Sequence, residues 1–465
     1  MKGLAVRETK LSEVFAHPET RAEAEFYLAP NGVQKNFVLG ETAVPFAQYG
    51  TSDELNEDGI GFPILRLNEI SNGFIEEVEK HCALLTAGKF EALKLKKGDV
   101  LVCRTNGNPR LVGKSGLVME DAAVAFASYL FRARPNPAII SPATLMVFLN
   151  SRNGRLEIEK HSIRSNQVNF SPERLRQARI PLFSEGFRNQ IDSKVDNAYL
   201  QRRMTDTAYI EADKTLLRAL KLENWQPPEP LTYIRRASDA LAMNRLDAEH
   251  FQPKYMAMLE RIQKHALHCR HVEEFSAHCD RGQQPEYVED GTLAVINSRH
   301  ILECGLDYDN FESTGAQYWN ELKFKSARIF RNDILTYTTG ANVGRTAAYL
   351  NDERALASNH VNLLRVNEVN PIYVATVMNS MIGRWQTQML VTGSAQAELY
   401  PDDILRFLIP FVEKKTEATI IAAVERAHAA RQRAHELLAA AQHAVEIAIE
   451  DSEAAALAHL KTHGV

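Results

Sequence analysis

The feature that most constrains the fold of this chain is a strand-and-loop frame that occurs twice. The first copy, residues 98–114, reads GDVLVCRTNGNPRLVGK, and the second, residues 332–345, reads NDILTYTTGANVGR. Both contain Asp, then Val or Ile and Leu, then Thr-x-Gly, then Val-Gly and a cation. One loop of this kind is compatible with chance, whereas a second copy indicates that the fold is built twice.

Other landmarks repeat in the same order, each about 230 residues after its first copy, a period far too long for a solenoid. The pairs are 11–15 with 237–241, 21–27 with 245–251, 62–70 with 293–301, 148–155 with 377–384, and 180–181 with 409–410. The repeat unit is therefore a whole module. We expect apolar strands at 60–70 and 122–131 and a helix that begins near Ser141.

Each module is followed by a long stretch with a narrow apolar stripe, which we call a seam. Residues 185–222 predict one helix about 50 Å long, and residues 416–460 predict a second. The first seam is Ile191, Val195, Ala198, Ala208, Ala212, Leu216 and Leu220; the second is Ile420, Val424, Leu437, Leu438, Val445 and Ile449. Two such seams bury each other most simply in an antiparallel pair.

The predicted fold class is therefore α/β (α+β), with two tandem modules in a pseudo-two-fold arrangement, separated by two long antiparallel coiled-coil helices. The predicted divisions are a first module at 1–184 with a short N-terminal helix and a first long helix at 185–225. The next divisions are a proline-rich linker with the start of the second repeat at 226–264, a second module at 265–412 and a second long helix at 413–465.

Composition narrows the class of protein. No apolar run is long enough to span a bilayer, and early charges argue against a signal peptide at the start. Five scattered cysteines argue against a disulfide framework and favour a reducing cytoplasm. The net charge is −5, yet residues 89–179 hold 16 cations against 7 anions. Because a phosphate backbone responds to the local field, this basic segment favours a nucleic-acid partner.

Three kinds of catalytic or metal site are compatible with parts of the sequence. Gly107 to Ser115 resembles a phosphate-binding loop, but the spacing is wrong in both copies. Asp307 or Asp309 with Glu321 and Lys323 is compatible with a metal-dependent nuclease, although the first module has no counterpart. The third is a cluster of histidines and cysteines that could bind a metal, but it lacks the ligand spacing of a zinc finger. Its members are His265, His268, Cys269, His271, His278 and Cys279. No catalytic residue or metal ligand is therefore predicted, and the chain itself is expected to be non-catalytic.

Binding is the remaining interpretation, because both copies carry polar and cationic residues where the strands open into loops. Arginine reads guanine edges, asparagine reads adenine edges, and lysine anchors phosphates. The candidate DNA-binding residues are Arg66, Asn68, Arg104, Thr105, Asn106, Asn108, Arg110, Lys114, Arg155, Asn297, Ser298, Arg299, His300, Tyr337, Thr338, Thr339, Asn342 and Arg345.

The duplicated frame, followed by Leu-Asn-Ser-x-x-Gly-Arg at 149–155, Ile-Pro at 180–181 and a long helix, resembles the specificity (S) subunits of type I restriction-modification systems. The resemblance implies two target recognition domains that read the two halves of an asymmetric double-stranded DNA site. It implies that the long helices fix the spacer and bind two methyltransferase (M) subunits, which use S-adenosylmethionine to methylate adenine N6. A restriction (R) subunit can join such a complex. No cofactor is expected on this chain itself.

Two alternatives remain open. One is a stand-alone two-module DNA-binding or phage-defence adaptor protein without a methyltransferase partner. The other is a nuclease that uses Asp307, Glu321 and Lys323. The acidic residues of the second helix suit a protein partner better than phosphate, and they are Glu436, Glu446, Glu450, Asp451 and Glu453.

Overall fold

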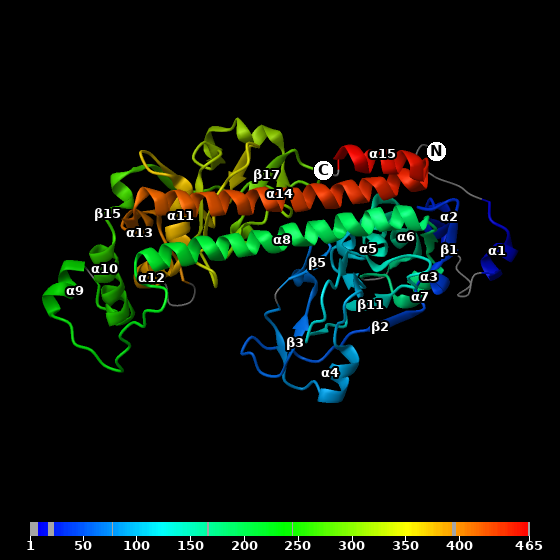
Figure 1. Ribbon diagram of the computed structural model, residues 1–465, viewed down its shortest axis with the longest axis horizontal. Helices are drawn as coiled ribbons and strands as arrows, with labels where there is room; N and C mark the ends of the chain where they lie inside the picture. Colours follow the sequence, from blue (N-terminus) through cyan, green and yellow to red (C-terminus); the bar gives the residue numbers. More distant parts are fainter. Residues whose placement is uncertain are drawn as a thin grey trace. The chain divides into compact units, whose positions relative to one another are not determined.

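The computed structural model describes residues 8–16, 23–76, 78–164, 167–243, 245–392 and 397–463 (Figure 1). The chain divides into two compact units. Unit 1 consists of Met1–Arg202 and Gln432–Val465, and unit 2 is Arg203–Arg431. Each unit holds one copy of the strand-and-loop frame. Of the predicted landmarks, Arg21 lies outside the described residues.

Unit 1 is built on a six-stranded sheet in the order β2-β11-β7-β9-β5-β4, in which only the β5–β9 pair is parallel. Its strands are β2 (Phe46–Tyr49), β4 (Ile70–Ser71), β5 (Phe74–Ile75), β7 (Val100–Cys103), β9 (Ser115–Leu117) and β11 (Leu130–Arg134). A smaller sheet, β10-β3-β6, consists of β3 (Phe62–Leu65), β6 (His81–Cys82) and β10 (Ala125–Phe126). The remaining strands are β1 (Phe37–Leu39), β8 (Thr105–Asn106), β12 (Ile163–Arg164), β13 (Val168–Asn169) and β14 (Arg179–Pro181).

Helices cover the main sheet of unit 1. The α5 helix starts where Ser141 Oγ accepts a hydrogen bond from the backbone N–H of Thr144, with Pro142 in the first turn. The helices of this unit are α1 (Leu11–Ala16), α2 (Ala24–Leu28), α3 (Gly40–Ala43), η1 (Leu67–Glu69), α4 (Ala87–Leu93), η2 (Pro109–Leu111), α5 (Pro142–Asn150), α6 (Arg152–His161), α7 (Pro172–Gln177) and α15 (Glu453–His463).

Unit 2 repeats this plan. Its main sheet has the order β16-β25-β22-β23, and its second sheet has the order β20-β17-β24-β21. The strands are β15 (His268–His271), β16 (Ser276–Arg281), β17 (Leu293–Ile296), β18 (Ile301–Leu302), β19 (Gly305–Leu306), β20 (Glu312–Thr314), β21 (Arg328–Ile329), β22 (Ile334–Tyr337), β23 (Thr346–Ala348), β24 (Ala355–Ala357), β25 (Val361–Val366) and β26 (Leu408–Phe411).

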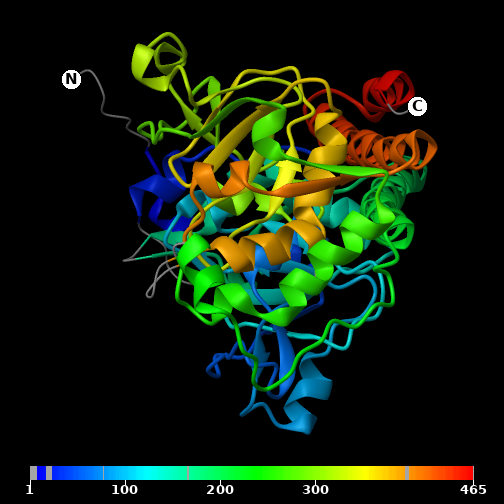
Figure 2. The ribbon, with the colours of Figure 1, turned by 90° about the vertical axis from the view of Figure 1, so that its left-hand side faces the viewer.

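The helices of unit 2, green and orange in Figure 2, lie around its yellow strands. The α11 and α12 helices follow the main sheet as α5 and α6 do in unit 1. The helices are α9 (Ala237–Met243), η3 (Glu249–Phe251), α10 (Pro253–His265), η4 (Val272–Glu274), η5 (Ser298–His300), η6 (Ala316–Trp319), η7 (Leu322–Phe324), α11 (Pro371–Asn379), α12 (Met381–Leu390) and α13 (Pro401–Leu405).

Two long helices, α8 (Glu185–Ala219) and α14 (Lys414–Glu450), contribute to both units. The first half of α8 shares a core with the second half of α14 in unit 1, and the opposite halves share a core in unit 2. Within unit 2 the two helices touch where Thr205 Oγ1 donates to the carbonyl of Ala427 at 3.2 Å. The predicted antiparallel seams are confirmed, and Leu216 and Ile420 are fully buried.

Several predicted boundaries were wrong. The second long helix was expected to run to residue 460, but it ends at Glu450 and α15 begins at Glu453. Ser452 interrupts the helix because its Oγ accepts from the backbone N–H of Ala455 and starts a new first turn. The first long helix ends at Ala219, shortly before Lys221, whose φ of 59° lies in the left-handed region.

Two predicted strands are also shorter than expected. The stretch at 122–131 forms β10 and β11, because a turn closed by the N–H of Leu130 and the carbonyl of Ala127 separates them. The stretch at 60–70 forms β3 and then η1, where the Glu69 carboxylate accepts from the N–H of Arg66 at 2.7 Å. In the described part of the chain, no helix is long and apolar enough to cross a bilayer.

Candidate nucleic-acid interface

The first strand-and-loop frame folds as the β7–β9 hairpin of unit 1. The apolar residues of β7 are fully buried, and the strand pairs with β11 and β9. Asp99, which precedes β7, is 1 % exposed and accepts hydrogen bonds from Arg132 at 3.2 Å and Arg134 at 2.5 Å. A buried carboxylate is stable only with such partners, so the Asp that both copies of the frame contain has a structural role.

The second frame forms the β22–β23 hairpin of unit 2 with the same anchor. Asp333 is 2 % exposed and accepts two hydrogen bonds from Arg365 of β25, at 2.7 and 2.9 Å. Burial raises the pKa of the Asp333 carboxyl, an effect that Arg365 opposes. Arg365 in β25 corresponds to Arg134 in β11. Each arginine directly follows the residue that pairs with the first residue of the frame strand, which is Ile334 in β22 and Val100 in β7.

The end of each hairpin is fixed by glycine. Gly113 has a φ of 86° and Gly344 a φ of 92°, a region that residues with a side chain rarely adopt. A Cβ at Gly113 would lie 2.5 Å from the Ile158 side chain, and a Cβ at Gly344 would lie 2.6 Å from Thr387. The Val-Gly pair of the frame is therefore required by backbone geometry and close packing.

An asparagine from the neighbouring helix holds each return strand. Asn150, the last residue of α5, accepts from the N–H of Ser115 at 3.0 Å and donates to its carbonyl at 2.9 Å. Asn379, the last residue of α11, accepts from the N–H of Thr346 at 3.0 Å. The repeated Asn-Ser motif thus couples helix and hairpin, and its serines, Ser151 and Ser380, cap the next helices.

The hairpin tips differ between the units. In unit 1, Asn106 Oδ1 accepts from the N–H of Asn108, and Asn108 Oδ1 accepts from the N–H of Arg110. These side chains fold the tip upon itself and leave Asn108 and Arg110 exposed. In unit 2, Thr338 is fully buried and Asn342 is exposed. The scaffold is constant and the tip is variable.

Cations in unit 1 surround the base of its tip. The Arg104 guanidinium lies over the Tyr49 ring at 5.3 Å. Arg155 donates to the carbonyl of Arg110 at 2.7 Å, and its own burial lowers its pKa. The half-buried Lys114 completes the set. Thr105, in β8, donates to Gln167 at 3.3 Å and ties the tip to the segment before β13.

The candidates at 66–68 and 297–300 lie at the equivalent 3-10 turns η1 and η5. In unit 1, Arg66 forms an ion pair with Glu69 at 2.5 Å, whereas Asn68 is exposed. In unit 2, His300 is 1 % exposed, and burial lowers its pKa to about 4, so the imidazole is neutral near neutral pH. Its Nδ1 lies 3.1 Å from the backbone nitrogen of Asn297.

The structure therefore divides the candidates by exposure. The exposed ones are Asn68, Asn108, Arg110, Arg299 and Asn342; the partly exposed ones are Arg66, Arg104, Thr105, Asn106, Lys114, Arg155, Asn297, Ser298, Tyr337, Thr339 and Arg345; the buried ones are His300 and Thr338. Three of the exposed or half-exposed arginines have acidic partners, since Arg66 is paired with Glu69, Arg299 is paired with Glu312 and Arg345 lies 3.6 Å from Glu303. Buried groups support the loops, and the exposed groups lie at the loop surface.

Residues named in the catalytic alternatives have other contacts in the described part of the chain. Residues 113–115 lead into strand β9, whereas a phosphate-binding loop leads into a helix. Asp307 and Asp309 lie 3.5 and 3.9 Å from Arg431. Among the described residues, no group of three or more His, Cys, Asp or Glu side chains could hold a metal ion. In the histidine- and cysteine-rich segment, His268 stacks on the Phe411 ring at 4.9 Å.

Four of the five acidic residues assigned to a partner surface have partners within unit 1. Glu436 lies 3.1 Å from Arg433 on the same helix. Glu446 accepts from the N–H of Arg152 at 2.7 Å, and Glu450 forms an ion pair with the Arg152 side chain. Glu453 accepts from the N–H of Ser184 at 2.8 Å. The last three carboxylates stabilise helix starts, where negative charge is favoured, and the assignment of the acidic residues to a partner surface stays a prediction.

Sequence reasoning missed a basic and aromatic surface in unit 2. The guanidinium groups of Arg328 and Arg354 both lie over the Trp319 ring, at 5.6 and 5.2 Å from its centroid. Lys323 and Lys325 are exposed beside it. The alternation of aromatic and basic residues at 318–331 is the signal that could have identified it, since this pattern is typical of nucleic-acid contacts.

Comparisons with known proteins point to one family. No family model matches the chain. A segment of 108 residues is 29 % identical to the type I restriction enzyme EcoKI specificity subunit of Escherichia coli, and it covers 23 % of this chain and 23 % of that protein. The chain thus matches about a quarter of the length of this curated relative. The relative belongs to the family that the repeated frame resembles, so the predicted resemblance to type I specificity subunits is confirmed.

Two solved structures are similar over most of the chain. The type I restriction-modification S subunit from M. genitalium has 10 % sequence identity and a TM-score of 0.40, and the similarity covers 90 % of this chain and 96 % of that one. The HsdS subunit from Thermoanaerobacter tengcongensis has 13 % identity and a TM-score of 0.28, with 92 % and 97 % covered.

Proposed function

We infer that this chain is a specificity subunit of a type I restriction-modification system and that it recognises DNA sequence on behalf of the complex. The observation that carries the proposal is the duplicated hairpin, in which buried anchors are the same and exposed tips are different. A pair of recognition modules with unlike tips suits a target whose two halves are unlike. A catalytic enzyme would need a gathered set of reactive groups instead.

The proposed target is double-stranded DNA with a bipartite, asymmetric sequence. Residues 1–184 and 265–412 are the proposed target recognition domains, and each reads one half-site. Exposed Asn108 and Arg110 suit base edges in unit 1, since asparagine and arginine form paired hydrogen bonds with adenine and guanine. Asn342 holds the corresponding place in unit 2.

The proposed partners are two methyltransferase subunits that bind S-adenosylmethionine and methylate adenine N6. The long helices α8 and α14 are the proposed docking elements for these subunits, and restriction subunits join the same complex. The chain itself contributes no catalytic group in this proposal. Because the two units share one plan, two copies of one methyltransferase can bind in equivalent ways.

The proposal is tested by expressing the chain with its methyltransferase partner and mapping methyladenine across the genome. We expect one bipartite motif that disappears when the chain is omitted. The double variant Asn108→Ala/Arg110→Ala should relax one half of the motif and leave the other half unchanged.

Three results would contradict the proposal. Methylation that does not depend on the chain would remove its role in recognition. DNA binding by a chain that forms no complex with an adenine methyltransferase would favour the stand-alone adaptor. DNA cleavage by the isolated chain with a divalent metal would favour the nuclease.

A further inference from the structure

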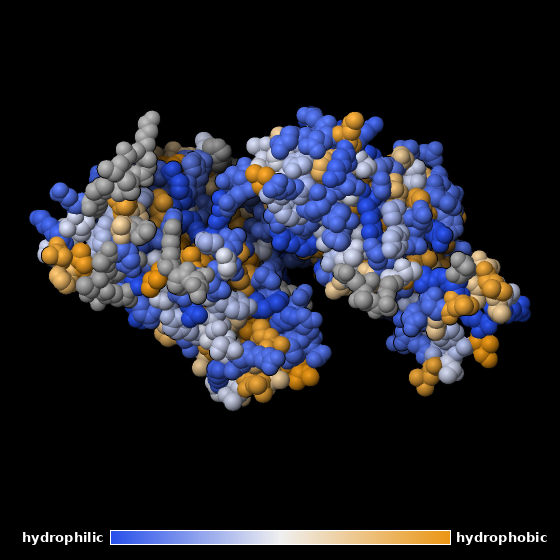
Figure 3. Space-filling view, turned by 180° about the vertical axis from the view of Figure 1, so that it is seen from behind, coloured by the Kyte–Doolittle hydropathy of each residue, from blue (hydrophilic) through white to orange (hydrophobic). Residues whose placement is uncertain are grey.

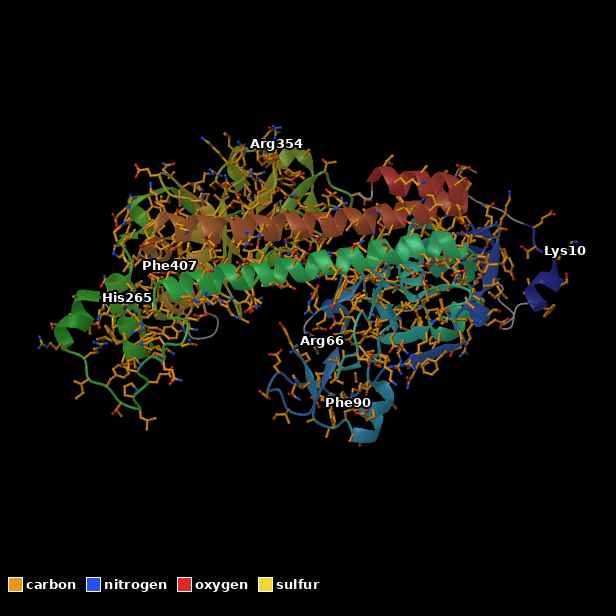
Figure 4. The ribbon with its side chains drawn as sticks, viewed as in Figure 1. Lys10, Arg66, Phe90, His265, Arg354 and Phe407 are labelled. Carbon is orange, nitrogen blue, oxygen red and sulfur yellow. The ribbon has the colours of Figure 1, made fainter. Side chains whose placement is uncertain are left out.

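Unit 2 carries a surface that the predicted recognition loops do not include. We call it the Trp319 surface and define it as Trp319, Lys323, Lys325, Arg328 and Arg354. It is formed by η6, η7 and the ends of β21 and β24, on the second sheet of this unit. Figure 4 shows Arg354 at the upper edge of unit 2, above α14 in that view.

The ring of Trp319 orders the two arginines. The guanidinium carbon lies 5.6 Å from the ring centroid in Arg328 and 5.2 Å from it in Arg354. An aromatic face attracts a cation and restricts its side chain, while the N–H groups at the guanidinium edge remain available. Arg354 is exposed, and Arg328 is partly exposed with one N–H directed to the carbonyl of Glu321 at 3.4 Å.

The charges of this surface are only partly balanced. Lys323, Lys325 and Arg354 are exposed, and none forms an ion pair with a carboxylate of the described residues. The nearby Arg331 is different, because it lies 3.2 Å from Asp352. Three positive charges therefore face solvent, and one of them, on Arg354, belongs to the pair of guanidinium groups on Trp319.

The equivalent lobe of unit 1 lacks these features. Its α4 lysines are paired: Lys89 lies 2.7 Å from Asp53, and Lys94 lies 3.6 Å from Glu91. Its aromatic pair, Phe62 and Phe90, stacks ring on ring at 4.1 Å with no guanidinium between. Among the described residues of this lobe no ring carries two guanidinium groups as Trp319 does, whereas Phe46 in the main sheet of unit 1 carries Arg132 at 5.6 Å and Arg134 at 5.0 Å.

We propose that the Trp319 surface binds the sugar–phosphate backbone of double-stranded DNA beside the half-site that unit 2 reads. Planar guanidinium groups and lysines are the usual partners of phosphate. Figure 3 shows that the upper part of unit 2 in that view is mainly hydrophilic, with a few hydrophobic residues. Contacts of this kind add affinity at all sequences and carry no base preference. The inference rests on the proposed function and adds a second contact region to it.

The test uses the full chain in complex with its methyltransferase partner and a DNA duplex that carries the mapped site. The triple variant Lys323→Gln/Lys325→Gln/Arg354→Gln is compared with wild type over a range of salt concentrations. Each lost phosphate contact lowers the slope of log affinity against log salt by about 0.9, so we expect a decrease between about 0.9 and 2.7. The preferred bases should not change.

A matched control removes the same charge from the same unit. Lys221→Gln/Lys264→Gln/Arg235→Gln alters two other exposed lysines and one exposed arginine of unit 2, all outside α8 and α14, and its slope should remain that of wild type. Trp319→Leu should weaken binding about two- to fivefold by releasing the arginines, and Trp319→Tyr should restore it.

The outcomes separate the two proposals. If wild type shows no preference for a mapped site, the proposed function fails. If wild type is selective but the triple variant keeps its salt slope, the Trp319 surface does not contact DNA. Loss of methyltransferase binding at an unchanged slope would assign the surface to a protein partner, and an altered base preference would show base reading in place of backbone binding.

Discussion

At the scale of single residues, the two buried aspartates show how much of each recognition hairpin is structural. Asp99 and Asp333 stand at the same place in the two copies and are held by arginines of the neighbouring strand. The exposed polar residues Asn108, Arg110 and Asn342 lie at the tips instead. The positions that the two copies share thus define the fold, and the positions at which they differ define the proposed reading surface.

Replacing Asp99 with alanine should destabilise the protein by about 3–5 kcal/mol, because Arg132, which is 2 % exposed, would keep an unpaired buried charge. The loss is measured by chemical denaturation. Glu91→Ala removes an exposed carboxylate whose side chain is 67 % exposed, and it should leave the denaturation midpoint unchanged. Equal effects of the two substitutions would disprove a special role for the buried network.

A second residue-scale prediction concerns pH. Burial lowers the pKa of His300 to about 4, below the value of about 6.5 that histidine has in an unfolded chain. The unfolded state therefore takes up more protons as pH falls, so stability is fully present above about pH 6.5 and is lost toward pH 4. His428, with its pKa also lowered to about 4, adds to the same trend.

The measurement is denaturation at several pH values for wild type and His300→Gln. The variant should lose less stability than wild type between pH 7 and pH 5, since it removes one of the groups that resist protonation. Replacing the exposed His360 with Gln is the control. A variant as acid-sensitive as wild type would show that His300 does not contribute.

At the scale of elements, the glycine that ends each hairpin offers a direct test of the scaffold. Gly113→Ala places a Cβ 2.5 Å from Ile158 at a φ of 86°, so we expect a loss of about 1–3 kcal/mol. Gly107→Ala changes the same hairpin where nothing lies within 4 Å, and it should leave stability unchanged. Calorimetry of the two variants checks this, and equal melting temperatures would contradict it.

The elements also show what the sequence could predict. The repeat, the long helices and their seams were predictable because each rests on a regular pattern over many residues. The end of α14 was not, since a single serine cap at Ser452 outweighs an apolar pattern that continues past it. The split of 122–131 into two strands depends on one local turn, which apolar composition does not reveal.

The candidate interface was predictable to a similar degree. Sequence spacing located both hairpins and their exposed tips. It could not predict that His300 and Thr338 are buried or that Arg66 pairs with Glu69, because these depend on contacts made in the folded unit. The Trp319 surface was missed because Arg354 joins Trp319 from a distant strand.

At the scale of the whole molecule, helix length should set the number of unspecified bases between the two half-sites. Deleting one heptad from both α8 and α14 preserves their seams and shortens each by about 10 Å. The preferred spacer should then become shorter in a methylation assay on spacer variants. Substituting seven exposed residues without deletion is the control, and an unchanged spacer would disprove the hypothesis.

The division of the chain has a consequence for its synthesis. Unit 2 is one continuous segment, whereas unit 1 draws on both Met1–Arg202 and Gln432–Val465. The core of unit 1 includes Leu437, Ala441 and Val445, which leave the ribosome after all of unit 2. All residues of unit 2 are therefore synthesised before unit 1 is complete, and unit 1 can close its core only after the second half of α14 has been made.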